Sequence, residues 1–214
     1  MSIRWVERAR VWHQYLLPKH ALTAIAWWLS NIRWAPFKNT FIRVFCQLFP
    51  VDLSEAAHSE VVDYENFNAF FTRPLKPHCR PKDSALVTSP SDGCISQLGQ
   101  LTGTEGDRLI QAKGLDYSLS ELVGTSQSLE AYRGGRWVTI YLAPFDYHRV
   151  HVPADGELVR ATRHAGELFS VSDKTARVIP KLYARNERLV CHFNHSKGPF
   201  MVVMVAALMV AGIE

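Results

Sequence analysis

The sequence predicts an α+β protein, with N-terminal amphipathic helices followed by a mainly antiparallel β domain that contains one or two short helices. Three observations predict this fold class: apolar residues recur at helical spacing near the N-terminus, short β-branched runs dominate from residue 84, and Gly, Pro and Asp turns separate those runs. The chain has 214 residues, of which 47% are hydrophobic and 21% are charged. This composition is typical of a globular protein with a sizeable core.

Residues 1–50 are expected to form helices that are broken at Pro18 and Pro36. The stretch 21–34 is too short and too often interrupted by polar residues to span a bilayer comfortably. The stretch 39–49 is predicted to be an amphipathic helix, because apolar side chains stand at i, i+3, i+4 and i+7: Phe41, Val44, Phe45 and Leu48.

Charge is distributed unevenly along the chain. Residues 1–50 carry seven Lys or Arg and one acidic residue, whereas the remainder carries 17 basic and 19 acidic residues. Five of the six tryptophans also lie in the first segment. An anionic membrane surface attracts this combination of basic charge and interfacial aromatic side chains, so the segment 1–50 is predicted to associate with membranes. The alternative is that its apolar faces only pack against the rest of the protein.

The segment 51–83 is predicted to be a connector with a short helix, because it is acidic and polar at first and is interrupted by prolines after Phe71. The segment 84–214 is predicted to be the β-rich catalytic domain. Its candidate strands are 94–98, 108–111, 137–142, 149–152, 157–163, 189–193 and 201–205.

Two short helices are expected within this β domain. Ser118 and Glu121 form a capping-box pattern that predicts a helix start, and a second helix is expected after Ser172. The nearly continuous apolar run 200–213 predicts one or two buried strands. Because a sheet normally continues beyond such a strand, the domain is expected to be incomplete at its C-terminus.

The cysteines and the N-terminus bear on the cellular compartment. The four cysteines (Cys46, Cys79, Cys94 and Cys191) have no C-x-x-C spacing, so neither a zinc site nor a disulfide framework is indicated, and a reducing compartment is expected. The N-terminus lacks the apolar region and the cleavage site of a signal peptide.

The candidate catalytic residues are Asp92, His148 and His151. If the segment that carries both histidines is a strand, they point to opposite faces, which argues against one shared metal ion. On a helix they would share a face, but Pro144 and Pro153 on either side argue against a helix. Separate roles are then expected, one as a base and one as a substrate contact. The alternative for each histidine is a purely structural role, and the alternative for Asp92 is an ordinary turn residue. Asp92 gains a catalytic role only if it orients a histidine. The charged block 185–188 is a turn or a phosphate contact.

The sequence resembles the pyruvoyl-dependent phosphatidylserine decarboxylases, particularly the bacterial membrane-associated type. The two most specific blocks are Asp146-Tyr147-His148-Arg149-Val150-His151 and Ala184-Arg185-Asn186-Glu187-Arg188. The resemblance runs from the basic N-terminus to the last residue. The further matching stretches are 67–75, 91–93, 110–114, 117–119, 141–145, 166–171 and 182–183.

The resemblance implies a proenzyme that cleaves itself. In this family a serine after a glycine attacks the preceding carbonyl, and the chain splits to leave an N-terminal pyruvoyl group, a covalent cofactor that serves as an electron sink for decarboxylation. Asp92 and His151 match the family positions that relay protons for the cleavage. His148 matches the histidine expected near the substrate carboxylate and the reprotonation step.

The sequence departs from the family pattern in one respect, since it contains no Gly-Ser dipeptide. The chain is therefore expected to be most of the larger (β) chain, truncated before the cleavage motif and inactive alone. A non-catalytic membrane-surface protein derived from this fold is the alternative function. An Asp/His hydrolase or a metal protein is ranked last, because no suitable nucleophile or third ligand stands beside these residues.

The expected partners follow from the resemblance and from the charge. They are phosphatidylserine, an anionic membrane surface and the smaller pyruvoyl-bearing α chain, whereas a homodimer is left open. Nucleic acid is not expected, because the basic charge accompanies tryptophans on apolar helices. The expected location is the cytoplasmic face of the cell membrane, as a peripheral protein.

Overall fold

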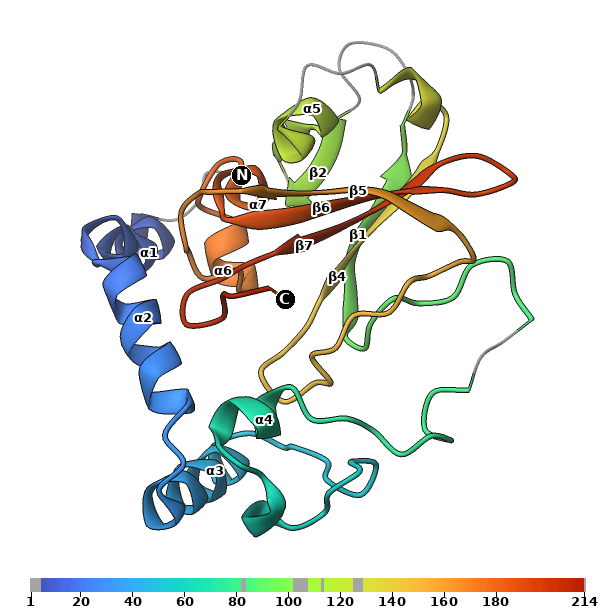
Figure 1. Cartoon of the computed structure of the whole chain (residues 1–214). Helices are drawn as coiled ribbons and strands as arrows, with labels where there is room; N and C mark the ends of the chain where they lie inside the picture. The colour runs from blue at the N-terminus through green and yellow to red at the C-terminus, as the bar shows by residue number, and fades with distance from the viewer. Residues whose placement is uncertain (1–4, 82–83, 102–107, 113, 125–128, 214) are drawn as a thin grey trace. The chain divides into compact units, whose positions relative to one another are not determined.

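The computed structural model describes residues 5–81, 84–101, 108–112, 114–124 and 129–213 (Figure 1). The chain divides into two compact units. Unit 1 consists of Met1–Ala24, Gln97–Thr139 and Gly156–Glu214, and unit 2 consists of Ile25–Ser96 and Ile140–Asp155. Three elements pass from one unit to the other: α2 (Lys19–Ser30) and the paired strands β1 (Cys94–Gln100) and β4 (Arg136–Tyr141).

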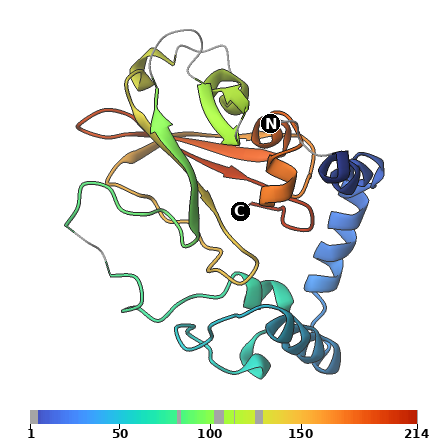
Figure 2. The ribbon, with the colours of Figure 1, turned by 180° about the vertical axis from the view of Figure 1, so that it is seen from behind.

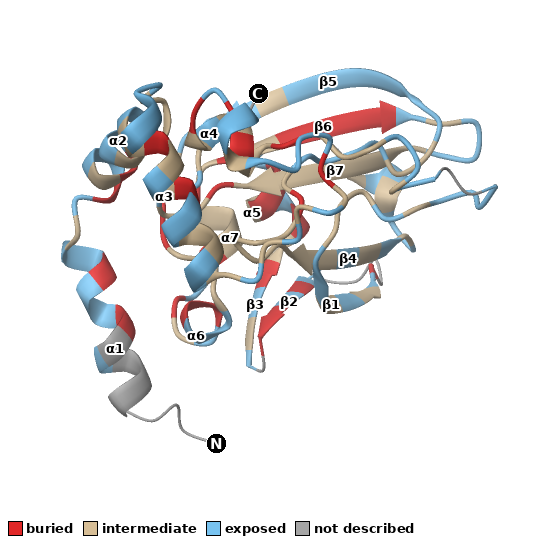
Figure 3. Cartoon of the chain, turned by 90° about the horizontal axis from the view of Figure 1, so that it is seen from below, coloured by how far each residue is buried: buried red, intermediate tan, exposed pale blue. Residues whose placement is uncertain are grey.

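A three-stranded antiparallel sheet forms the centre of unit 1. Its order is β5 (Glu157–His164), β6 (Arg188–Asn194) and β7 (Phe200–Val205). Figure 3 shows that the central strand β6 is mostly buried, whereas β5 is mostly exposed. The sequence of β6 explains this difference, because an apolar run with few charges suits a strand that is covered on both faces.

A hairpin and a short helix complete one core of unit 1. Strands β2 (Arg108–Ala112) and β3 (Leu115–Ser118) pair antiparallel, and α5 (Leu119–Val123) follows directly, as Figure 2 shows from behind. The predicted capping box is present, because Ser118 and Glu121 each accept a backbone N–H at the helix start. The buried core residues are Leu101, Leu109, Tyr117, Leu119, Leu122, Val123 and Val190.

The N-terminal helix α1 (Trp5–Leu16) belongs to a second core of unit 1. Val11 packs in a cluster with buried residues near α6 (Asp173–Ala176) and α7 (Leu182–Arg185). The Gln14 side chain donates to Thr175 and accepts from the backbone N–H of Ser170. One side of α1 thus packs on unit 1, whereas Trp12 and Leu16 on the same helix are exposed. A 3₁₀ turn, η2 (Glu130–Tyr132), precedes β4.

Aromatic side chains hold the helical part of unit 2 together. Helices α3 (Ala35–Leu48) and α4 (Phe67–Phe71) lie side by side in Figures 1 and 2, with the 3₁₀ turn η1 (Val61–Asp63) between them in sequence. The buried residues are Ile42, Tyr64 and Phe70. The side chain of Asn66 caps α4 by accepting the N–H of Ala69.

The structure confirms the predicted fold class, since helices at the N-terminus precede mainly antiparallel strands. Six of the seven candidate strands are found within two residues of their expected bounds. The predicted strand 149–152 is wrong, because these residues form irregular backbone. The backbone N–H of His151 bonds to Pro90, and Pro144 and Pro153 on either side cannot donate to a ladder.

Three further features differ from expectation: the role of Pro36, the apolar face of α3 and the burial of residues 200–213. Pro36 lies in the first turn of α3, where a missing N–H costs nothing, so it starts this helix instead of breaking it. The predicted apolar face of α3 is split, because Phe41 and Phe45 pack inward whereas Val44 and Leu48 are exposed. The run 200–213 forms one strand that is half-buried and not fully buried.

The described residues include no helix with both the length and the apolar character that crossing a bilayer requires. The predicted functional division at residues 50 and 83 stays a prediction.

Candidate active site

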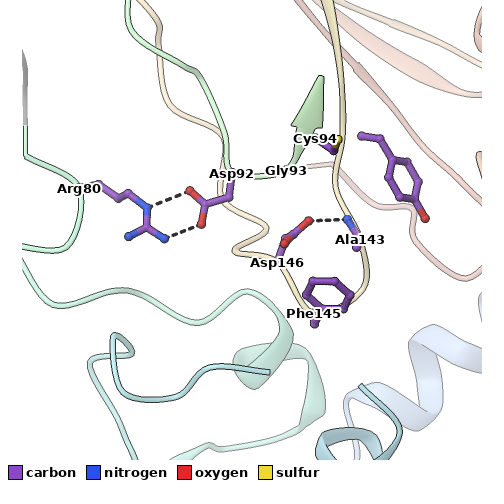
Figure 4. Close-up of a pocket in the computed structure, with 8 residues that line it drawn as sticks. Arg80, Asp92, Gly93, Cys94, Ala143, Phe145 and Asp146 are labelled. Carbon is purple, nitrogen blue, oxygen red and sulfur yellow. Dashed lines mark hydrogen bonds and ion pairs between the residues drawn. The ribbon is translucent and has the colours of Figure 1, made fainter. Parts of the chain in front are cut away.

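An open pocket of about 670 Å³ lies within unit 2. It forms where the start of β1 meets the end of β4 and the loop that follows β4 (Figure 4). Its lining residues are Arg80, Asp92, Gly93, Cys94, Tyr141, Ala143, Phe145 and Asp146. The structure therefore places one of the three candidate residues, Asp92, in the pocket wall.

The turn Ser91-Asp92-Gly93 has a structural reason for its glycine. Gly93 has a φ of +122°, and a Cβ atom added there would lie 2.4 Å from the carbonyl oxygen of Tyr141. Only glycine tolerates both the backbone conformation and this close approach. The sequence Asp-Gly thus fixes where the carboxylate of Asp92 stands beside the pocket.

Asp92 is held by an arginine. The Arg80 guanidinium donates to both carboxylate oxygens of Asp92, with Nε to Oδ1 at 2.8 Å and Nη2 to Oδ2 at 2.5 Å (Figure 4). These hydrogen bonds hold the pKa of Asp92 below its usual value, although partial burial opposes them. Asp92 is therefore ionised at neutral pH.

His151 lies on the loop after β4, close to the turn of Asp92. Its backbone N–H donates to the carbonyl of Pro90 at 2.7 Å, which ties the two loops together. Its Nε2 shares a hydrogen bond of 3.0 Å with the hydroxyl of the buried Tyr147, and the two rings stack. Within the described residues the His151 ring makes no hydrogen bond to the Asp92 carboxylate, whose oxygens both accept from Arg80.

His148 is in a drier environment on the same loop. The ring centroids of Phe71 and His148 are 4.0 Å apart. Burial lowers the pKa of His148 below its usual value. The imidazole is therefore neutral at pH 7. Its Nδ1 is 2.8 Å from the carbonyl oxygen of Asp146, which only accepts hydrogen bonds, so Nδ1 carries the proton and Nε2 keeps its lone pair.

Helix α4 and the segment after it hold this loop in place from both sides. Arg73 is 3% exposed and donates to the carbonyl of Phe145, whereas Arg149 donates to the carbonyl of Thr72. The Asp146 carboxylate accepts the N–H of Ala143 at 2.6 Å and closes a turn within the loop. These three hydrogen bonds hold the His148 loop in place together with the bond from the backbone N–H of His151 to Pro90.

The structure gathers Asp92, His148 and His151 within unit 2, and it adds two residues that sequence reasoning missed. Arg80 stands 12 residues before Asp92, and no local periodicity links them. In the sequence Tyr147 stood out only as a neighbour of the histidines, although a tyrosine hydroxyl close to a candidate base could have indicated a hydrogen-bond partner for that base. Among the described residues, no group of three or more His, Cys, Asp and Glu side chains could hold a metal ion.

The block 184–188 lies in unit 1 and is used internally. The Arg188 guanidinium donates to four backbone carbonyls, namely those of Glu121, Leu122, Ala184 and Asn186. Asn186 is fully buried and bonds to the backbone of Phe169 and Ala206. These two side chains fix the turn before β6, and the phosphate-contact alternative does not apply to them.

Comparisons with known proteins cover nearly the whole chain. The family model for phosphatidylserine decarboxylase matches residues 67–214, and a second model, described as PSD, matches residues 9–50. The chain is 48% identical over 204 residues to the phosphatidylserine decarboxylase proenzyme of Methylococcus capsulatus, which covers 94% of this chain and 70% of the relative.

Two further relatives carry the same name. The proenzyme of Methylibium petroleiphilum is 46% identical over 208 residues, covering 97% of this chain and 72% of the relative. That of Legionella pneumophila (strain Corby) is 47% identical over 201 residues, covering 94% and 70%. The first family match alone spans more than half of the sequence, and its range contains Asp92, His148 and His151. The chain belongs to the phosphatidylserine decarboxylase family.

Proposed function

We propose that this chain is the larger part of an enzyme that decarboxylates phosphatidylserine to phosphatidylethanolamine in phospholipid biosynthesis. The observation that supports the proposal is that Asp92 lines the pocket of unit 2 while the loop of His148 and His151 is tied to the turn of Asp92 through the His151 N–H and Pro90, in a chain of this family. Because the 214 residues contain no Gly-Ser dipeptide, we propose that the pyruvoyl-forming serine lies outside them and that self-cleavage of the proenzyme leaves it at the start of a smaller partner chain.

The chemistry of the pocket fits a covalent pyruvoyl group. When bound, such a group supplies the electron sink for loss of carbon dioxide. The open pocket beside Asp92 has room for a reacting centre, and its eight lining residues include no lysine, whose amine would compete with the substrate amine for a ketone. The neutral imidazole of His148 adds a nitrogen base on the same loop.

Asp92 and His151 are proposed to serve the self-cleavage step. A serine hydroxyl is a weak nucleophile and needs a base to take its proton. His151 offers Nε2, the atom that now shares a hydrogen bond with the Tyr147 hydroxyl, as the site that holds this proton. The ionised Asp92 stabilises the imidazolium that forms. This pairing requires the Asp92 carboxylate to turn toward the ring.

His148 is proposed to serve the decarboxylation step. Its neutral state at pH 7 leaves Nε2 able to accept a proton and deliver it to the carbon that loses its carboxylate. The Phe71 ring excludes water from one face of the imidazole, which preserves that neutral state. The hydrogen bond to the Asp146 carbonyl fixes the tautomer and the direction of Nε2.

The test is to complete the chain with a C-terminal segment that carries a Gly-Ser motif, and to measure chain cleavage on a denaturing gel and carbon dioxide release from phosphatidylserine. Asp92→Asn and His151→Ala are expected to slow cleavage by about 10²–10⁴-fold. His148→Ala is expected to leave cleavage intact and to lower decarboxylation by a similar factor. His195→Ala, on an exposed turn of unit 1, is the matched control.

Cleavage at the normal rate in Asp92→Asn or His151→Ala would refute the assigned roles. Cleavage of the completed wild-type chain without any release of carbon dioxide would favour the non-catalytic membrane-surface alternative.

The segment 1–50 is proposed to hold the protein at the cytoplasmic face of the cell membrane, with 51–83 as the connector and 84–214 as the catalytic part. Trp27, Trp28 and Trp34 are 60–68% exposed, and Leu48 on α3 is 71% exposed. Exposed tryptophans beside basic residues suit the interface of an anionic leaflet.

Liposome flotation tests the membrane proposal. The chain is expected to float with vesicles that contain anionic lipid, to release in high salt, and to bind less when Trp27 and Trp28 are replaced by Ala. Failure to bind anionic vesicles at low salt would contradict the proposal.

A further inference from the structure

The Arg80 side chain uses all of its hydrogen-bonding capacity on three groups. A guanidinium has five N–H donors, and here two reach Asp92, two reach Glu55 and one reaches the carbonyl of Cys79. The Arg80–Glu55 distances are 3.2 and 2.9 Å, and the contact to the Cys79 carbonyl is 2.7 Å. Arg80 is therefore a bridge between two carboxylates and carries no donor for a ligand.

This bridge competes with the pairing that the proposed cleavage needs. Both oxygens of Asp92 accept from Arg80, and the positive charge of the guanidinium offsets the negative charge that would stabilise a His151 imidazolium. The positive charge of Arg73 also acts on Asp92. The ring of His151 instead shares its hydrogen bond with Tyr147.

We propose that Arg80 is a positioning residue that restrains Asp92, and that Glu55 sets the strength of this restraint by competing for the same guanidinium. The inference rests on the proposed role of Asp92 and His151 in self-cleavage. The cleavage rate then depends on how the guanidinium divides between the two carboxylates. Weakening the Arg80–Asp92 contact frees the carboxylate for His151, whereas removing Glu55 turns the guanidinium wholly toward Asp92.

The exposure of the three side chains makes such a division adjustable. Arg80 is 38% exposed, Glu55 is 40% exposed and Asp92 is 27% exposed. Water can replace either contact, so the restraint is a modest bias and not a rigid lock. We expect rate changes of up to about fivefold, the range that one partly exposed ion pair supports.

The contact itself is tested on the 214-residue chain by NMR titration of the Asp92 carboxyl carbon. Arg80→Gln removes the group that holds the pKa of Asp92 low, so the pKa is expected to rise toward its usual value. Glu55→Gln is expected to lower it further. An Asp92 pKa that does not change in Arg80→Gln would overturn the contact and the proposal with it.

The restraint is tested in the complete proenzyme by the rate of chain cleavage. Arg80→Gln is expected to cleave faster than wild type, and Glu55→Gln is expected to cleave more slowly. If Arg80 and Glu55 were needed only for folding, both variants would cleave more slowly than wild type. Arg80→Lys keeps the charge but loses the planar fork, so its rate should lie between wild type and Arg80→Gln. Arg177→Gln, an exposed arginine that pairs with Asp173, is the matched control and should match wild type.

The two proposals fail in distinguishable ways. If Asp92→Asn and His151→Ala cleave normally, the proposed roles are wrong whatever Arg80 does. If those variants stop cleaving but Arg80→Gln cleaves at the wild-type rate or more slowly, the roles stand and the restraint by Arg80 is overturned.

Discussion

The loop of residues 146–151 in unit 2 and the block of residues 184–188 in unit 1 differ in how much of their hydrogen-bonding capacity the protein uses. Arg188 gives its guanidinium to four backbone carbonyls, and Asn186 is 0% exposed with its amide bonded to the backbone. His148 and His151, in contrast, each show one ring nitrogen in a hydrogen bond. A side chain that retains capacity is available for chemistry, whereas a saturated one determines structure.

The largest stability loss is expected at Asn186. Asn186→Ala leaves the backbone N–H and C=O of Phe169 and the C=O of Ala206 without their partner in a buried site. The expected cost is about 3 kcal/mol of unfolding free energy, measured by urea denaturation. Asn194→Ala, at the exposed end of β6, is the control and should change stability by less than about 0.5 kcal/mol. Equal losses in the two variants would refute the structural role of the block.

Arg188 should show the next largest effect. Arg188→Met removes the donor to four carbonyls but also removes the cost of burying a charge, which already lowers the pKa of this arginine. We therefore expect a smaller loss of about 2 kcal/mol in the same denaturation experiment. A variant as stable as wild type would show that the desolvation cost and the hydrogen bonds cancel.

The sequence predicted the fold class and the strands with regular apolar patterns because those depend on local periodicity. It also predicted the helix start at Ser118, which depends on residues three apart. It could not reveal the irregular backbone at 149–152, which depends on a hydrogen bond from His151 to Pro90. The Arg80–Asp92 pair likewise joins two loops, and only the folded chain brings such residues together.

The loop of residues 146–151 and the block of residues 184–188 also differ in how their contribution to stability depends on pH. Burial lowers the pKa of His148, so the folded state favours the neutral ring. The resulting contribution to stability is fully present above the ordinary histidine pKa of about 6.5 and is lost as the pH falls through the lowered value. His148→Gln removes that loss, so its melting temperature should fall less than that of wild type between pH 7 and pH 5.

Asn186→Ala supplies the control for this pH experiment. Neither Asn186 nor the amide that replaces His148 titrates between pH 5 and pH 8, so Asn186→Ala should keep the wild-type dependence on acid at a lower overall stability. An identical acid dependence in His148→Gln and wild type would mean that His148 is not held neutral by burial.

The smallest effect is expected at Glu187, the one member of the block 184–188 whose side chain pairs with a largely exposed arginine. Its carboxylate accepts from Arg163 at 2.8 Å, and the Arg163 side chain is 66% exposed although that of Glu187 is only 14% exposed. Water and salt screen such a pair, so Glu187→Gln should cost only about 0.5 kcal/mol at low salt and less at 1 M salt. Urea denaturation at two salt concentrations measures both values. A loss near that of Asn186→Ala would mean that the block acts as one unit, whereas the small loss that we expect would show that the solvent exposure of the partner, and not membership of a specific motif, decides what a side chain contributes.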